Sequence, residues 1–104
     1  MNKIGIDLVH IPTFEQKTKN NGNLFINKIF SAQEIESNTQ NSSLAGKFAA
    51  KEAFIKAFNP TKFDLKDILV LKKENKPYIM FKNKKYTGVS ISHDGEYATA
   101  IVIL

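Results

Sequence analysis

The sequence predicts a small α+β protein in which an antiparallel sheet packs against one long helix and several shorter helices. Three observations on the 104 residues support this fold class. Residues 4–9 alternate like a strand, residues 44–58 form a long and almost wholly apolar helical run, and residues 68–104 switch to short β-rich segments. Because helices do not alternate with strands, the order favours α+β over a doubly wound parallel sheet. This length predicts a single domain over 1–104.

The first predicted element is a strand over residues 4–9. Ile4, Ile6 and Leu8 alternate there with Gly5, Asp7 and Val9. Since successive side chains of a strand point to opposite faces, Asp7 is expected on the face opposite the isoleucines. A lone aspartate near the end of a strand is most often a turn or cap group, so a metal-binding role for Asp7 needs support from other residues.

The segment before the long helix is expected to contain shorter helices. Asn20–Asn23 is predicted to break residues 13–30 into two helical pieces, and Ser31–Glu34 has the capping-box spacing that predicts the start of a third. Residues 40–43 offer loop and N-cap chemistry for the long helix, which Asn59–Pro60 should end.

The long helix is the best-defined predicted element. An apolar stripe and a series of alanines cover most of its surface, and these are Leu44, Phe48, Ile55 and Phe58 with Ala45, Ala49, Ala53 and Ala57. We therefore expect it to be largely buried. Glu52 and Lys56 are spaced i,i+4 and share one side of this helix, which fits both a stabilising pair on a solvated rim and a charged binding edge. A basic amphipathic membrane anchor is a third interpretation, but the nearly all-round apolar surface favours burial.

The second half of the chain is predicted to form four strands, Ile68–Leu71, Tyr78–Lys82, Val89–Ser92 and Tyr97–Leu104. Lys73–Pro77 connects the first two of these strands. His93–Glu96 is a predicted hairpin turn between the last two. Lys82–Lys85 is expected to be a basic turn that faces solvent.

Composition limits the classes of partner and chemistry. The chain has 15 basic and 10 acidic residues and a formal net charge of +5, which favours an anionic partner. The lack of cysteine excludes disulfides and thiolate chemistry, and two histidines leave little scope for a zinc cluster, so any metal should be hard and bound by oxygen. No leader or membrane span is recognised, so a cytoplasmic location and no membrane partner are expected.

Three separated motifs, read together, identify a family. Gly5–Ile11, Phe48–Ala57 and Ile91–Asp94, in this order and in a short basic chain, resemble the bacterial holo-acyl-carrier-protein synthases, the small class of 4′-phosphopantetheinyl transferases. The resemblance extends to Phe30–Glu34 and Lys76–Tyr78, and so covers nearly the whole chain. It implies a 4′-phosphopantetheinyl transferase-like fold.

The resemblance also implies a reaction. Such enzymes transfer the 4′-phosphopantetheine group from coenzyme A to a serine of apo-acyl carrier protein, giving holo-carrier and adenosine 3′,5′-bisphosphate in support of fatty acid biosynthesis. By resemblance, Asp7 and Glu52 are the metal ligands, and carboxylates suit hard Mg²⁺. Lys56 would then neutralise the leaving group, so Glu52 and Lys56 are the predicted catalytic residues. The general base stays open between Glu52 and a metal-bound water.

Further contacts to coenzyme A follow from the resemblance. Lys47, Lys56, Ser92 and His93 are expected to contact its phosphates, and the active sites are expected at subunit boundaries of a homotrimer. Lys51 lies nearer the apolar stripe than Glu52 does, and its role stays open between a snorkelling stem at the helix edge and a phosphate contact.

The chain also departs from the family. Where relatives carry arginines, it has Thr13, Asn20 and Leu24; it keeps positive charge at Lys28 and adds Lys17 and Lys19. Lysine does not reproduce the forked pairing of arginine with carboxylates, so the mode of carrier docking stays open. The connection 82–88 is shorter than in relatives and leaves room only for a turn.

The alternative to this enzyme is a small basic nucleic-acid-binding domain. Lys82–Tyr86 and the neighbouring strands would then form a charged, aromatic-bearing surface. The family resemblance favours the enzyme and no nucleic-acid partner.

Overall fold

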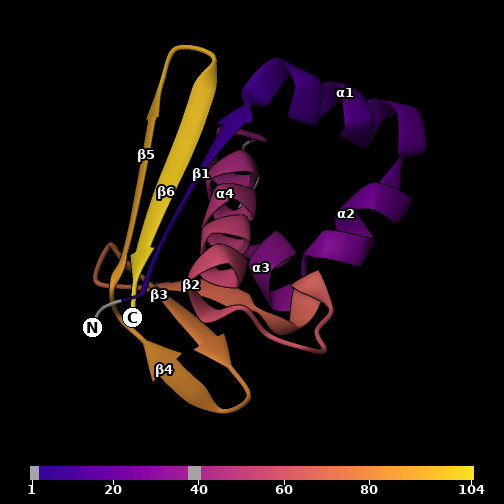
Figure 1. Cartoon of the computed structure of the whole chain (residues 1–104). Coiled ribbons are helices and arrows are strands. Elements are labelled where there is room, and N and C mark those ends of the chain that lie inside the picture. Colours follow the sequence, from indigo (N-terminus) through magenta and orange to yellow (C-terminus); the bar gives the residue numbers. More distant parts are fainter. Residues whose placement is uncertain (1–2, 38–40) are drawn as a thin grey trace.

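The computed structural model describes residues 3–37 and 41–104. The elements in chain order are β1 (Ile4–His10), α1 (Ile11–Asn21), α2 (Asn23–Ile29), α3 (Ala32–Glu36), α4 (Asn41–Phe58), the 3-10 helix η1 (Leu65–Asp67), β2 (Leu69–Lys73), β3 (Lys76–Phe81), β4 (Lys84–Tyr86), β5 (Val89–Asp94) and β6 (Tyr97–Ile103) (Figure 1). The predicted α+β class is confirmed. No helix among the described residues is long and apolar enough to cross a bilayer.

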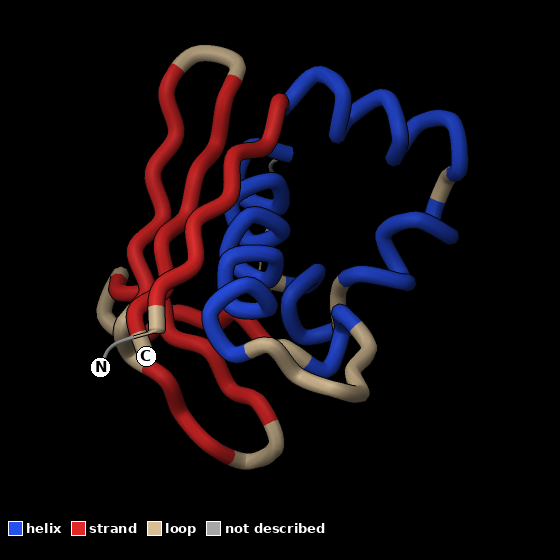
Figure 2. The backbone as a smooth tube through the Cα atoms, viewed as in Figure 1, coloured by secondary structure: helices blue, strands red, loops and turns tan. Residues whose placement is uncertain are grey.

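The strands divide into two antiparallel three-stranded sheets (Figure 2). The first sheet has the order β1-β6-β5, so the first strand of the chain pairs with the last. The second sheet has the order β2-β3-β4. Helix α4 packs against the first sheet, and α1 and α2 form an arm that leaves the end of β1 and returns toward α4. We call α1 with α2 the arm below.

Strand β1 approaches α4 closely because Gly5 has no side chain. A Cβ at Gly5 would overlap the carbonyl oxygen of Ala53 on α4. The alternation predicted for this strand is confirmed, since Gly5 and Val9 are buried while Ile4, Ile6 and Leu8 are exposed. Asp7 shares the inner face of the sheet with the two buried residues and therefore faces the helix.

The outer face of the first sheet is apolar and exposed. Its large exposed side chains are Ile4, Ile6 and Leu8 of β1 and Tyr97 and Ile103 of β6, with 45 to 64% of their surface accessible. The register places Ile4 opposite Ile103, so the residues of the two strands adjoin. We call these five residues the apolar outer face.

The second sheet and its turns carry the net positive charge of the chain. All 15 basic residues are lysines, and residues 72–85 hold six of them with one glutamate, a net charge of +5. The remaining nine lysines are matched by nine acidic residues, so the rest of the chain is neutral overall. The six side chains are exposed and belong to Lys72, Lys73, Lys76, Lys82, Lys84 and Lys85. We call β2-β3-β4 the lysine sheet.

Most predicted helix boundaries agree with the structure. The break in residues 13–30 falls at Gly22, whose φ of 56° is the left-handed conformation that glycine tolerates. The predicted capping box is confirmed, because Ser31 Oγ accepts from the Glu34 backbone and Glu34 Oε1 accepts from the Ser31 backbone. Residues 41–43 belong to α4 rather than to a loop, and Gln40 lies outside the described residues.

The connections in the lysine sheet are shorter than predicted. Glu74–Asn75 and Lys82–Asn83 each make a two-residue turn with positive φ at both positions, the geometry that best matches the twist of paired strands. The strands therefore extend to Lys73 and Lys76. The prediction that the 82–88 connection leaves room only for a turn was wrong, because residues 84–86 form β4.

Candidate active site

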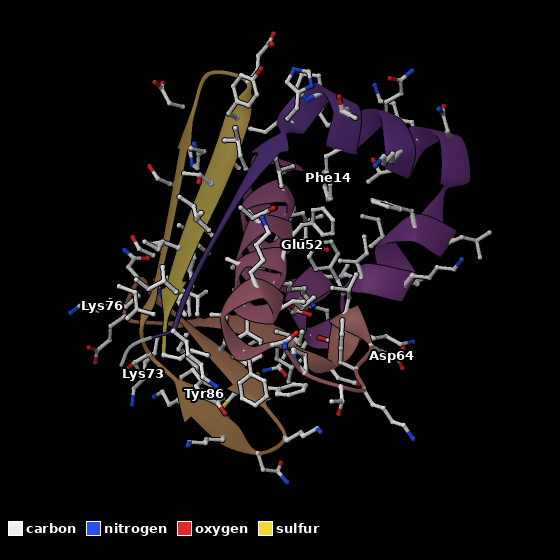
Figure 3. The ribbon with its side chains drawn as sticks, viewed as in Figure 1. Phe14, Glu52, Asp64, Lys73, Lys76 and Tyr86 are labelled. Atoms are coloured by element: carbon white, nitrogen blue, oxygen red, sulfur yellow. The ribbon has the colours of Figure 1, made fainter. Side chains whose placement is uncertain are left out.

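A pocket of about 290 Å³ lies where β1, the arm and α4 meet. Its polar lining is Asp7, His10, Thr13, Lys17 and Glu52, and its apolar lining includes Phe14, Phe25 and Phe48. Phe14 extends from α1 toward α4, and Glu52 lies on the helix below it (Figure 3). The structure thus brings together the two predicted metal ligands, which are 45 positions apart in the sequence.

Phenylalanines hold the arm against α4. The ring of Phe14 lies 5.8 Å from Phe25, 6.4 Å from Phe30 and 5.7 Å from Phe48, measured between centroids. These aromatic pairs fill the space between arm and helix, and they fix the back wall of the pocket by burial of apolar surface.

Lys56 pairs across elements rather than along its own helix. Its ammonium donates to Asp7 Oδ1 at 3.2 Å and to the Ile6 carbonyl at 2.8 Å. The Lys56 side chain is half exposed, whereas that of Asp7 is largely covered. The cation predicted from the i,i+4 spacing is therefore bonded to the strand carboxylate, and it bridges β1 and α4 beside the pocket.

The two carboxylates of the pocket repel each other. Burial is the main cause that raises the pKa of Glu52, the nearby Asp7 raises it further, and Lys56 opposes both. A site that holds two adjacent negative charges is stabilised by a bound cation. Among the described residues no group of three or more acidic or histidine side chains could hold a metal. The protein would thus supply two oxygen ligands, and other ligands would come from substrate and water.

His10 also lines the pocket, although it was not among the predicted site residues. His10 Nδ1 lies 2.7 Å from Thr13 Oγ1, and Nε2 lies 3.3 Å from Glu96 Oε2. These contacts tie the start of α1 to the β5–β6 turn. The position of His10, at the end of a predicted strand that carries Asp7, was the available signal.

The structure does not bring Ser92 and His93 to this pocket within one chain. Both lie on β5, where Ser92 pairs with Thr99 and His93 with Ala98 of β6. Strand β6 separates them from β1, so they stand at the opposite edge of the first sheet.

Lys47 lies at a separate place on α4. It is 4% exposed, and its ammonium donates to Ser37 Oγ at 3.1 Å and to the Glu34 carbonyl at 3.4 Å. Burial lowers its pKa, and the nearby Lys72 lowers it further against the effect of Glu34. Lys47 and Lys72 line a second hollow of about 280 Å³.

Both interpretations of Lys51, a snorkelling stem and a phosphate contact, were wrong. Its ammonium is fully buried, so it is no snorkelling stem, and it already donates to Glu34 and two carbonyls, so it is not free for a phosphate. Burial lowers the pKa of Lys51 to about 8, although Glu34 raises it. Local periodicity gave no sign of Glu34, which is 17 positions away.

The fold and the pocket define a class of protein. The chain belongs to the 4′-phosphopantetheinyl transferase superfamily, whose family model matches residues 3–102. It is similar to the holo-[acyl-carrier-protein] synthase of Wolbachia pipientis wMel, with 34% identity over 100% of this chain and 94% of the relative. The synthase of Ehrlichia ruminantium (strain Gardel) is 37% identical over 97% of this chain and 94% of its own length. The crystal structure of Helicobacter pylori holo-[acyl-carrier-protein] synthase in complex with coenzyme A matches with a TM-score of 0.88 and 32% identity, covering 97% of this chain and 99% of that one. None of these comparisons supports the nucleic-acid alternative.

Proposed function

We propose that this chain, acting as a single domain, transfers the 4′-phosphopantetheine group from coenzyme A to a serine of an apo-acyl carrier protein, in support of fatty acid biosynthesis. The observation that carries this proposal is the meeting of Asp7, Glu52 and Lys56 beside one pocket in a chain of this family. Relatives that match over nearly their whole length are named for this reaction, which supports the same activity here.

The pocket fits a hard divalent cation, and we assign Asp7 and Glu52 as its ligands. Two oxygen donors on separate elements face one space, and their mutual repulsion is a cost that such a cation removes. When bound, Mg²⁺ would supply charge neutralisation for the pyrophosphate of coenzyme A. The protein's part is to hold both carboxylates in place, through the close β1–α4 packing at Gly5.

Lys56 supplies a second positive charge at the reacting phosphates. In the reaction the serine oxygen forms a bond to the phosphorus of the pantetheine phosphate, and the serine proton passes to a general base, which is Glu52 or a water molecule. The bond from this phosphorus to the bridging oxygen breaks, and its electron pair leaves with adenosine 3′,5′-bisphosphate. An ammonium placed beside the pocket stabilises the charge that grows on this leaving group. The side chain of Lys56 is half exposed, so its ammonium is accessible to a phosphate.

Ser92 and His93 are proposed to contact coenzyme A in an assembly rather than in one chain. Lys47 is 4% exposed and bonded to Glu34 and Ser37, so its proposed contact with coenzyme A requires those bonds to be exchanged. Ser92 and His93 lie at the far edge of the first sheet, so they would serve the pocket of a neighbouring copy. The apolar outer face supports self-association, since five large apolar side chains are exposed on one side of the sheet. Three copies is the number that the family resemblance implies, and a cyclic arrangement gives equivalent sites.

Mass spectrometry of the carrier tests the proposed reaction. The chain is incubated with coenzyme A, Mg²⁺ and an apo-carrier, and the carrier is expected to gain the mass of one phosphopantetheine group. A carrier whose acceptor serine is replaced by alanine is the control and should gain nothing. No mass gain on the intact carrier over a range of carriers and divalent metals would contradict the proposal.

A further inference from the structure

Glu34 and Lys51 form a buried ion pair whose hydrogen-bonding capacity is used on both sides. Glu34 Oε1 accepts from Lys51 Nζ at 2.7 Å and from the Ser31 amide at 3.0 Å, and Oε2 accepts from the Val70 amide at 3.0 Å. Both side chains are fully buried. Among the described residues, no buried side-chain nitrogen or oxygen lacks a partner.

The remaining donors of Lys51 reach two other elements. Its ammonium donates to the Ile29 carbonyl at 2.6 Å and to the Leu65 carbonyl at 2.9 Å. Ile29 is the last residue of α2, so the ammonium caps the negative end of the helix that finishes the arm. The same ammonium lies 5.1 Å from the centre of the Phe30 ring. One side chain of α4 therefore holds the far end of the arm.

A gain in stability does not explain such a pair. Removing two charges from water is costly, and well-packed apolar residues of similar volume often stabilise a core as well or better. The pair instead fixes positions, because the three short hydrogen bonds from the Lys51 ammonium are directional and determine where its partners lie. Aromatic contacts among the phenylalanines of the arm are less directional.

The position of the pair relates it to the candidate active site. Lys51 immediately precedes Glu52, so the two side chains extend from the same turn of α4 on different sides. The Lys51 ammonium bonds to Ile29, and the Glu52 carboxylate lies in the pocket. The arm supplies the pocket wall opposite Glu52, through Phe14 and Phe25. The distance from this wall to Glu52 depends on where the arm is held, and β1 and the Lys51 ammonium hold its two ends.

We propose that Glu34 and Lys51 are positioning residues for the active site: their ion pair seats the arm on α4 and thereby sets the pocket between the arm and Glu52. The effect on turnover rests on the proposed function, whereas the seating of the arm does not. Neither residue contacts the reacting atoms. Their role is to keep the wall that receives the substrates at a fixed distance from the carboxylates.

A double variant separates positioning from stability. Lys51→Met alone leaves a buried uncompensated carboxylate and is expected to be poorly folded. Glu34→Gln with Lys51→Met removes both charges at nearly constant volume and keeps an acceptor for the Val70 or Ser31 amide. We expect this double variant to be folded. Because the arm is no longer seated, kcat should fall about 10- to 100-fold, while KM for coenzyme A changes little.

Hydrogen exchange measures the seating of the arm directly. Hydrogen exchange in the double variant should rise in the amides of α1 and α2 and stay unchanged in α4 and β3. The matched control is Ile79→Ala, a fully buried position on β3 outside both the pocket and the pair. It should lower the urea midpoint while kcat of the folded protein and exchange in the arm stay at wild-type values.

The outcomes distinguish this inference from the proposed function. A double variant with wild-type kcat and wild-type exchange in the arm overturns the positioning role. So does a loss of kcat that Ile79→Ala reproduces at equal loss of stability. If the wild-type chain transfers nothing to any carrier, the proposed function has failed, and exchange in the arm still decides whether the ion pair seats it.

Discussion

The two sheets of this molecule have opposite outer surfaces. The first sheet shows the apolar outer face and carries Asp7 on its inner side, whereas the lysine sheet shows charge and contributes no residue to the pocket. Exposed apolar patches of this kind are typical of protein–protein interfaces. Exposed lysines on short strands prevent sheets of different molecules from pairing edge to edge. Under the proposed function, the first sheet would serve assembly and catalysis, and the lysine sheet would serve solvation.

The lysine sheet also contains an unfavourable pair of like charges. Lys73 is paired directly opposite Lys76, and like charges at opposite positions of an antiparallel pair destabilise it. Figure 3 shows both residues near the edge of the molecule, away from Glu52. The two lysines flank the Glu74–Asn75 turn, whose geometry matches the twist of paired strands.

The largest expected effect is on activity and belongs to the first sheet. Asp7→Asn removes one of two carboxylates and an ion-pair partner of Lys56, so transfer to the carrier should fall by about a hundredfold or more. Glu74→Gln, a matched loss of one acidic charge in the lysine sheet, should leave transfer unchanged. The rate of mass gain on the carrier measures both. Equal activity of the two variants would remove the distinction between the sheets.

The next prediction concerns assembly. Ile6→Glu places a charge on the apolar outer face, and a buried unpaired charge at an interface is costly, so the assembly should dissociate to monomers. Activity should fall by about tenfold or more if pockets are shared between copies. Light scattering measures the oligomeric state, and Lys76→Glu is the control on the other sheet. Ile6→Glu with unchanged mass and activity would refute the shared site.

A third prediction follows from the raised pKa of Glu52. Its ordinary value is 4.5, and burial raises it in the folded chain. The folded chain then binds more protons than the unfolded chain, so the free energy of unfolding falls as pH rises from 4.5 through the raised pKa. Glu52→Gln removes this loss and should flatten the profile. Urea unfolding across this pH window measures it, and parallel profiles for the two proteins would contradict the assignment.

The smallest expected effect lies in the lysine sheet. Lys76→Glu converts the repulsion with Lys73 into an attraction across the pair, so the free energy of unfolding should rise by about 0.5 kcal/mol. The gain should shrink in high salt, because exposed charges are screened. Lys66→Glu, an exposed lysine on η1, gives the effect of net charge alone. A Lys76→Glu gain no larger than that of Lys66→Glu would show that opposition across the strands is unimportant.

Much of the fold was predictable because it depends on local patterns. The β1 alternation, the capping box at Ser31 and the apolar helix each appear within a few residues of sequence. The strand ends around Glu74 and Lys82 were not predicted, because neither residue is a usual choice for a left-handed turn position. Pairing with a neighbouring strand decides such ends, and local propensity does not.

The candidate site was predictable in part, but by resemblance to a family rather than from local patterns. Asp7, Glu52 and Lys56 were selected by resemblance, and the structure places them beside one pocket, while their roles remain proposals. The partner of Lys51 could not be predicted, because a buried charge selects its counter-ion by proximity in space. The capping box already explained Glu34 from local sequence, so nothing pointed to its second role as the partner of Lys51.

The confinement of net charge to the lysine sheet gives this chain an uneven charge distribution. A neutral body with +5 on one small sheet has its positive pole there, whatever the total charge suggests. In the cyclic trimer proposed above, the components of the three dipoles perpendicular to the symmetry axis cancel, and the components along the axis add. Such an assembly would be electrically polar along its axis to the extent that the three lysine sheets lie toward one end of it.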